Sequence, residues 1–387
     1  ILKGPGIMGS RRSYLRTTLV AFQFGFAITM IVSTIVVRNQ VMFVQARDSG
    51  YVKDRLVYQY LTGDLKENFE GYKNDLLQHE IAQSITQTSS PITERLSNSS
   101  GIRWRGKDTD NKTSIERFYV DQNITATAGL ELAEGRDFDL KRFPSDSTAM
   151  LLNETAVRVM EFDDPVGEII IDNGQEWHVI GVVRDFILTS PYQNVEPMVL
   201  AGSKHTWAFN VVHIRLNSDR STQESIAAMS QIFTKYNPDY PFEYHFVDVE
   251  YARKFSDLEK TLTLTTIFTS VAIFIACLGL LGLSAYIAES RVKEIGIRKV
   301  LGGSVLSITR LLSGNALKPI FIAIVLFTPL GWLGVDWWLN SFAYRVSIPV
   351  WVFPMAGTTI ILIAWVTISV QTIRAANTDP VKTLRSE

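Results

Sequence analysis

Residues 261–288, TLTLTTIFTSVAIFIACLGLLGLSAYIA, contain no charged side chain and decide the fold class of this chain. Three further runs without Asp, Glu, Lys or Arg lie at residues 19–37, 319–335 and 346–373. A helix needs roughly 20 apolar residues to cross a bilayer core of about 30 Å. The sequence therefore predicts four transmembrane helices, at residues 19–37, 261–288, 319–338 and 346–373.

The rest of the chain has the composition of a water-exposed protein. The sequence of 387 residues has 38 Lys and Arg against 39 Asp and Glu, all outside the four uncharged runs. Residues 38–260 separate the first two spans and are numerous enough to form a core of their own. A signal peptide is the alternative for residues 19–37. Their apolar stretch exceeds the usual length of roughly 7–15 residues, and no small-residue cleavage site precedes Arg38, so we expect an uncleaved span.

Basic residues in the short segments predict the orientation. Residues 1–18 carry four Lys and Arg and no acidic residue, and basic residues are frequent at 289–318 and in the tail, 374–387. The only charged residues between the third and fourth runs are Asp336 and Arg345. Because short cytoplasmic loops are rich in Lys and Arg, we expect both ends and the 289–318 loop in the cytoplasm. Residues 38–260 then lie outside.

The 38–260 segment alternates strand and helix patterns, which predicts an α+β domain. The tripeptide Asp172-Asn173-Gly174 lies between two apolar runs and predicts a type I′ hairpin, because Asn-Gly accepts positive φ. The sequence from Ser221 to Glu224 is a capping box that predicts the start of a helix. Short strand-like runs occur at residues 56–60, 116–120, 149–152, 177–183 and 208–216.

Apolar residues continue at helical spacing beyond the first two spans. They are Val41 and Val44 after the first span, and Ala252, Phe255 and Leu258 before the second. Residues 38–48 and 243–260 contain no Gly or Pro, whereas a flexible linker would be rich in Gly and Ser. We therefore expect both helices to run on outward as a paired, rigid stalk.

The sequence lacks the motifs of several catalytic and binding classes. It contains no G-x-x-x-x-G-K-[ST] loop for nucleotide phosphates, and the pair His79-Glu80 lacks the second histidine of a zinc-protease helix. The single cysteine, Cys277, lies within a span and excludes an intrachain disulfide. No basic stripe with aromatic residues predicts nucleic-acid binding. We expect a noncatalytic chain without a metal or cofactor of its own.

Residues 291–304, RVKEIGIRKVLGGS, form a charged and apolar segment directly after the second span. One interpretation is an amphipathic helix on the cytoplasmic membrane surface, and the other is a short docking helix for a partner protein. The spacing does not separate the two. The residues that we expect to couple the chain to a partner are Arg291, Val292, Glu294, Ile295, Ile297, Arg298 and Lys299.

This sequence resembles the MacB/FtsX-like permeases of ABC transporters. The resemblance rests on residues 291–304, on the C-terminal DPVKTLR at residues 379–385 and on the layout of one span, a large domain and three spans. The large domain also resembles the periplasmic core domain of that family. The matching stretches are GRDF at 135–138, LLNETA at 151–156, DPVG at 164–167 and VIGVVRDF at 179–186.

The resemblance implies an α-helical membrane protein with four transmembrane helices plus a large α+β periplasmic domain of two lobes on a helical stalk. It implies a porter-like lobe at about 50–123 and 205–247 and an inserted small lobe at about 124–204. It also implies a bacterial inner-membrane location and a separate cytoplasmic ABC ATPase that binds ATP and docks on residues 289–304. The chain resembles the second half of a tandem eight-span permease, and a homodimerising protomer is the alternative.

Three functions follow for comparison. In the first, the chain is a noncatalytic permease that transmits ATPase motion to its periplasmic domain for efflux or extraction of a periplasmic substrate. A periplasmic adaptor or a substrate protein would be a further partner, beside membrane lipid. In the second, the same architecture serves an ATPase-gated sensor of peptides or a regulator of cell-wall hydrolases. The third, an ATP-independent receptor or enzyme, is disfavoured by the missing catalytic motifs and by residues 291–304.

Overall fold

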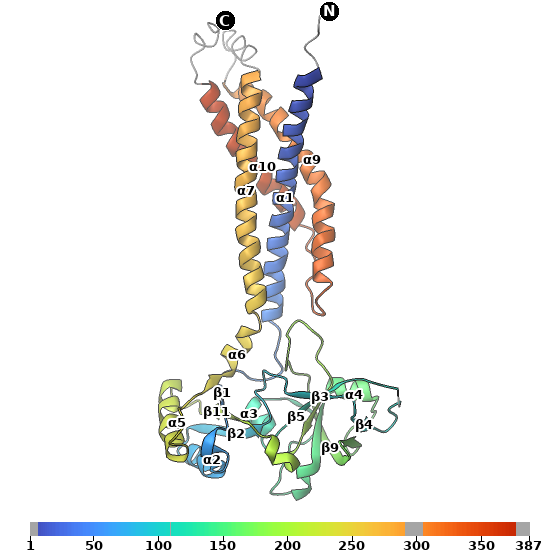
Figure 1. Cartoon of the computed structure of the whole chain (residues 1–387), viewed down its shortest axis with the longest axis vertical. Coiled ribbons are helices and arrows are strands. Elements are labelled where there is room, and N and C mark those ends of the chain that lie inside the picture. Colours follow the sequence, from blue (N-terminus) through green and yellow to red (C-terminus); the bar gives the residue numbers. More distant parts are fainter. Residues whose placement is uncertain (1–6, 109, 291–304, 377–387) are drawn as a thin grey trace, which may run out of the picture. The chain divides into compact units, whose positions relative to one another are not determined.

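The computed structural model describes residues 7–108, 110–290 and 305–376, which are coloured in Figure 1. The chain divides into two compact units. The helical unit contains residues up to Gln45 and residues from Asp257 onward, and the α+β unit contains Ala46–Ser256.

The helical unit consists of four long helices. They are α1 (Ile7–Gln45), α7 (Ser256–Ser290), α9 (Val305–Leu339) and α10 (Val352–Ala376), and Figure 1 labels each of them. Each contains a segment long and apolar enough to cross a membrane, at Tyr14–Gln45, Ser256–Ile287, Leu317–Leu339 and Val352–Val370. The fourth helix begins at Val352 rather than at residue 346, so the predicted start of that span is wrong. Pro349 disfavours helical geometry in the residue before it, which explains the later start.

Small residues allow the membrane helices to approach one another closely. A Cβ atom on Gly25 of α1 would lie 2.2 Å from the Phe327 ring of α9. A Cβ atom on Gly279 of α7 would lie 2.0 Å from Oε1 of Gln23 on α1. Ala276 is fully buried in the same cluster. This packing agrees with the general use of Gly and Ala at helix contacts in membranes.

The first lobe of the α+β unit is built on a four-stranded sheet in the order β12-β1-β11-β2. Its strands are β1 (Leu56–Tyr60), β2 (Ala82–Thr88), β11 (Val211–Leu216) and β12 (His245–Phe246). Helices α2 (Phe69–Gln78) and α5 (Thr222–Tyr236) pack on it through an apolar core that includes Tyr72, Met229 and Phe233. Helix α6 (Val247–Arg253) follows β12.

The second lobe is built on an eight-stranded sheet, in which β6 pairs with β9 beside the order β3-β5-β10-β7-β9-β8-β4. Helix α4 (Glu154–Met160) packs on β7. The strands are β3 (Ser97–Ser99), β4 (Arg103–Trp104), β5 (Ile115–Tyr119), β6 (Leu132–Gly135), β7 (Ala149–Asn153), β8 (Ile169–Asp172), β9 (Gln175–Val183) and β10 (Met198–Ala201).

The predicted division into lobes is wrong at its first boundary. Strands β3, β4 and β5 precede residue 124 but belong to the eight-stranded sheet, because β5 pairs with β10 in parallel and β4 pairs with β8. Helix α3 (Ile124–Ala128), which opens the predicted small lobe, packs instead on β2 and β11 of the first lobe. The chain therefore crosses between the lobes repeatedly. Short strand patterns indicate a strand but not its distant partner, which explains the error.

Two local predictions are confirmed. Strands β8 and β9 form a hairpin in which Asp172 faces Gln175, and Asn173 and Gly174 both have positive φ, at 50° and 77°. The Ser221 side chain accepts a hydrogen bond from the Glu224 amide, and the Glu224 side chain accepts one from the Ser221 amide. This reciprocal pair is the predicted capping box at the start of α5.

Candidate functional site

The residues predicted to couple the chain to a partner lie outside the described residues. All seven, Arg291, Val292, Glu294, Ile295, Ile297, Arg298 and Lys299, fall within residues 291–304. Their role stays a prediction. The site that can be built from the structure is the place where the chain enters and leaves the α+β unit, and we call residues 46–56, 186–196 and 251–256 the junction.

The stalk residues take up different positions. Val41 and Val44 lie on α1 and are 4% and 0% exposed, and Leu258 lies on α7 and is buried. Ala252 is exposed on α6, and Phe255 lies in the break between α6 and α7. Helix α7 thus extends outward beyond the predicted span as far as Ser256, which includes Leu258 but not Ala252 or Phe255, whereas α1 is unbroken to Gln45.

The break between α6 and α7 is held by Lys254. Its ammonium group donates hydrogen bonds to the carbonyl oxygens of Thr93, Leu188 and Thr189, at 2.5, 3.0 and 2.6 Å. Burial lowers the pKa of Lys254 to about 8, and the charge of Glu94 acts in the opposite direction. Thr93 follows β2, and the other two carbonyls belong to the loop between β9 and β10. One side chain thus ties the end of α6 to two distant segments.

Aromatic rings lie around the hydrogen bonds of Lys254. Tyr51 contacts Phe186 and Tyr251 edge-on, with ring centroids 6.4 and 6.0 Å apart. Phe255 contacts Tyr251 and Tyr192 at 5.5 and 6.0 Å, and the Tyr192 hydroxyl donates to the carbonyl of Lys254. Edge-to-face pairs of this kind contribute about 0.5–1.5 kcal/mol each beyond area burial. The entering segment, the β9–β10 loop and the leaving segment therefore form one packed cluster.

Two hydroxyl groups in this cluster are not satisfied. The hydroxyl oxygens of Tyr51 and Tyr251 are buried and have no hydrogen-bond partner within the described part of the chain. A buried polar group without a partner costs about 1–3 kcal/mol.

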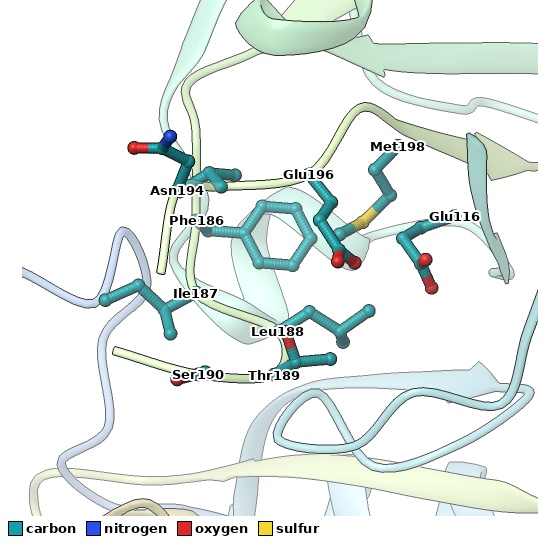
Figure 2. Close-up of a pocket in the computed structure, with 10 residues that line it drawn as sticks. Glu116, Phe186, Ile187, Leu188, Thr189, Ser190, Asn194, Glu196 and Met198 are labelled. Carbon is teal, nitrogen blue, oxygen red and sulfur yellow. The ribbon is translucent and has the colours of Figure 1, made fainter. Parts of the chain in front are cut away.

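A small cavity lies under the β9–β10 loop, and Figure 2 shows the residues that line it. Its volume is about 10 Å³, close to the minimum that one water molecule requires. The carboxylates of Glu116 and Glu196 lie on the same side of it, and Arg95 forms ion pairs with both. Burial, with the neighbouring Glu196 carboxyl, raises the pKa of Glu116 to about 7.

The helical unit has polar contacts along α1 that the apolar composition of the spans does not predict. The hydroxyl of Thr269 on α7 lies 2.8 Å from that of Thr34 and donates to the carbonyl of Met30 on α1. At the end of the same helices, Gln45 Nε2 donates to Glu259 Oε1 at 2.9 Å. Polar side chains buried between membrane helices fix their register. Helices α1 and α7 are thus joined by side-chain hydrogen bonds at two levels, at Thr269 and at Gln45.

The loop between α9 and α10 is fastened to α1 by one amide. Gln40 is fully buried, its Nε2 donates to the carbonyl of Tyr344 at 2.7 Å, and its Oε1 accepts from the amide of Val346 at 2.9 Å. Among the described residues, no group of His, Cys, Asp and Glu could hold a metal ion.

Sequence reasoning missed the central residues of the junction. Lys254 and Tyr192 lie in segments without a motif, and their partners are far away in the chain. The one available signal was the concentration of aromatic residues near both ends of the α+β unit, at Tyr51, Tyr251 and Phe255.

The chain combines four apolar helices with a two-lobed α+β unit whose two ends meet at the junction. This combination is that of a membrane protein with a large domain outside the membrane. The chain matches the MacB-like periplasmic core domain over residues 17–232 and the FtsX-like permease C-terminal domain over residues 266–380. The chain belongs to the MacB/FtsX-like family of ABC transporter permeases.

Curated relatives include macrolide export ATP-binding/permease proteins MacB. The protein from Neisseria meningitidis is 23% identical over 265 residues, which are 65% of this chain and 38% of the relative. The protein from Aggregatibacter actinomycetemcomitans is 22% identical over 249 residues, which are 61% and 36%. This chain therefore spans well under half the length of these relatives.

Solved structures with some likeness are periplasmic or extracellular domains. The periplasmic region of MacB from Actinobacillus actinomycetemcomitans has a TM-score of 0.39 and 15% identity, covering 53% of this chain and 94% of that one. The extracellular domain of the ABC-type transporter YknZ from Gram-positive bacteria has a TM-score of 0.35 and 15% identity, covering 49% and 97%.

Proposed function

We propose that this chain is the noncatalytic, force-transmitting permease subunit of an ABC transporter in the bacterial inner membrane. A separate cytoplasmic ATPase docks on residues 289–304 and supplies ATP binding and hydrolysis, so the chain needs no cofactor of its own. The permease acts with a second permease half or a second copy of itself. Its periplasmic domain moves during the ATPase cycle and drives efflux or extraction of a periplasmic substrate, with an adaptor protein as a further partner.

The length and continuity of α1 is the observation that supports transmission most directly. At 1.5 Å per residue, the 39 residues of Ile7–Gln45 form a rod of about 58 Å, roughly twice the bilayer core. Its contacts with α7 at Thr269 and Glu259 make the two helices a braced pair. Helix α1 leads directly into the α+β unit, where Lys254 and the aromatic cluster join the entering and leaving segments.

The docking part of the proposal is tested by co-purification of the cognate ATPase with the full chain in detergent. Ile295→Asp should abolish association, because it replaces an apolar anchor with an unpaired charge. Glu294→Lys should weaken association by roughly 1–3 kcal/mol, and more at low salt. Wild-type amounts of ATPase on Ile295→Asp would contradict docking at this loop.

The transmission part is tested by amide exchange of the α+β unit in the reconstituted complex, with and without ATP. Two glycines inserted between Val41 and Met42 of α1 cost about 1 kcal/mol each and create a hinge. This variant should keep the ATPase but lose the ATP-dependent change in exchange. The same insertion between Ser218 and Asp219, in an exposed turn, is the matched control and should leave the change intact. An ATP response that survives the α1 insertion would refute transmission through this helix.

A further inference from the structure

The α+β unit contains a large groove that the proposed function does not use. Its volume is about 820 Å³, within the range of roughly 300–1,000 Å³ typical of ligand sites. It is bordered by the β8–β9 hairpin, by β5 and by the 3-10 helix η3 (Ser203–Ala208). The residues that line it are Leu96, Ser97, Arg117, Tyr119, Asn173, Gly174, Gln175, His205, Trp207, Ala208 and Asn210.

An ion pair shows that the sheet beside the groove is curved. The Arg117 guanidinium on β5 lies 2.5 Å from the carboxylate of Asp172 at the end of β8. These strands are four positions apart in the sheet, where a flat arrangement would separate them by roughly 19 Å. The sheet must therefore curl, and the curl places the Asn173–Gly174 turn opposite η3.

The groove is electrically neutral. Arg117 is its one charged lining residue, and Asp172, with 3% of its side chain exposed, compensates that charge. Nε of Arg117 is buried without a hydrogen-bond partner in the described residues. The side chains of Ser97 and Asn173 also make no hydrogen bond within the described chain. The groove thus offers hydrogen-bonding groups without net charge.

Aromatic rings form one wall. The His205 ring contacts those of Tyr119, Trp177 and Trp207, with centroids 5.8, 5.7 and 5.8 Å apart. Trp207 is nevertheless 71% exposed. Trp207 contacts one ring, that of His205, and leaves most of its surface in water, so that it has a face free for a ligand.

We propose that this groove binds an uncharged oligosaccharide, with one pyranose ring stacked on Trp207. A pyranose has an apolar face of C–H groups and a rim of hydroxyls. This combination matches an exposed indole beside the side-chain amide of Asn173 and the side-chain carbonyl oxygens of Gln175 and Asn210. Nε2 of Gln175 already donates to the carbonyl of Glu176, and Nδ2 of Asn210 donates to those of Ser89 and Ala208. A charged ligand would find no uncompensated partner in the groove. The proposal does not depend on the transport function above.

The test uses the full chain in lipid nanodiscs, which avoids sugar-based detergents. Tetra-N-acetylchitotetraose and cellotetraose serve as probes in titration calorimetry and saturation-transfer NMR. We expect saturable binding of at least one probe. Trp207→Ala should weaken it by about tenfold or more, and Trp207→Phe should weaken it less, because a ring face remains.

Tyr240→Ala is the control, because Tyr240 is also an exposed aromatic residue but lies beside Gly63 in the first lobe, outside the groove. Circular dichroism checks that each variant is folded. Three results would overturn the proposal: no saturable binding of either probe, equal binding by Trp207→Ala, or Trp207-dependent binding of an extended neutral peptide without any binding of sugar.

Discussion

The hydrogen bonds of Lys254 provide the sharpest test of the junction. Lys254→Met keeps the length and apolar stem of the side chain but removes its donors. The carbonyls of Thr93, Leu188 and Thr189 then lose the bonds that Lys254 makes to them. Hydrogen bonds to a charged group contribute about 1.5–3 kcal/mol each, and water replaces part of this in a half-exposed site. We expect local opening of the β9–β10 loop to become easier by about 3 kcal/mol, an increase of roughly 150-fold in its opening constant.

Amide hydrogen exchange of the full chain in nanodiscs measures this opening. The informative peptide covers residues 186–196, in which the Ile187 amide donates to the carbonyl of Ser49 at 2.8 Å. Lys53→Met is the matched control. Lys53 lies over the Tyr251 ring in the same cluster, at 4.2 Å from its centroid, but its ammonium is not the partner of these carbonyls. Exchange in Lys254→Met within about threefold of wild type would refute the view that this side chain holds the loop.

Two further tests concern single buried side chains. The folded state raises the pKa of Glu116 to about 7, whereas a glutamate in the unfolded chain releases its proton near pH 4.3. Protonation of Glu116 therefore stabilises the folded state. This contribution is complete below about pH 4 and is lost as the pH rises through 7. Glu116→Gln should therefore gain thermal stability relative to wild type between pH 5 and pH 8, and a difference independent of pH would contradict this. Gln40→Leu should lower the stability of the helical unit by about 2–4 kcal/mol and expose residues 340–351 to amide exchange, because it leaves two backbone groups unpaired. Gln40→Glu, which still accepts from the Val346 amide, should lose less; a loss equal to that of Gln40→Leu would show that the bond from Val346 contributes nothing.

The helical unit was largely predictable from sequence, because crossing a membrane requires a long uncharged run and such runs can be read directly. The hairpin at Asn173 and the capping box at Ser221 were predictable for a similar reason, since each depends on a few adjacent residues. The fourth helix begins later than predicted, and Pro349 explains that error, whereas the other three helices extend beyond the predicted spans.

The junction was not predictable, because its contacts join residues far apart in the sequence. The spacing of Ala252, Phe255 and Leu258 favours a continuous helix. The bend at Lys254 is fixed by carbonyls 65, 66 and 161 residues away, which no local pattern indicates. The predicted boundary between the lobes was wrong for the same reason, since β5 pairs in parallel with β10, which is distant in the sequence.

The interleaving of the two lobes limits how this unit can change during evolution. The first lobe contains residues before β3, then α3, then residues from β11 onward, and the second lobe takes the segments between them. No continuous stretch of the chain contains the whole of one lobe without part of the other. Recombination therefore cannot exchange a lobe between related genes as a cassette. New specificity has to arise by point substitutions and loop insertions, and the pair of lobes is inherited as one indivisible module.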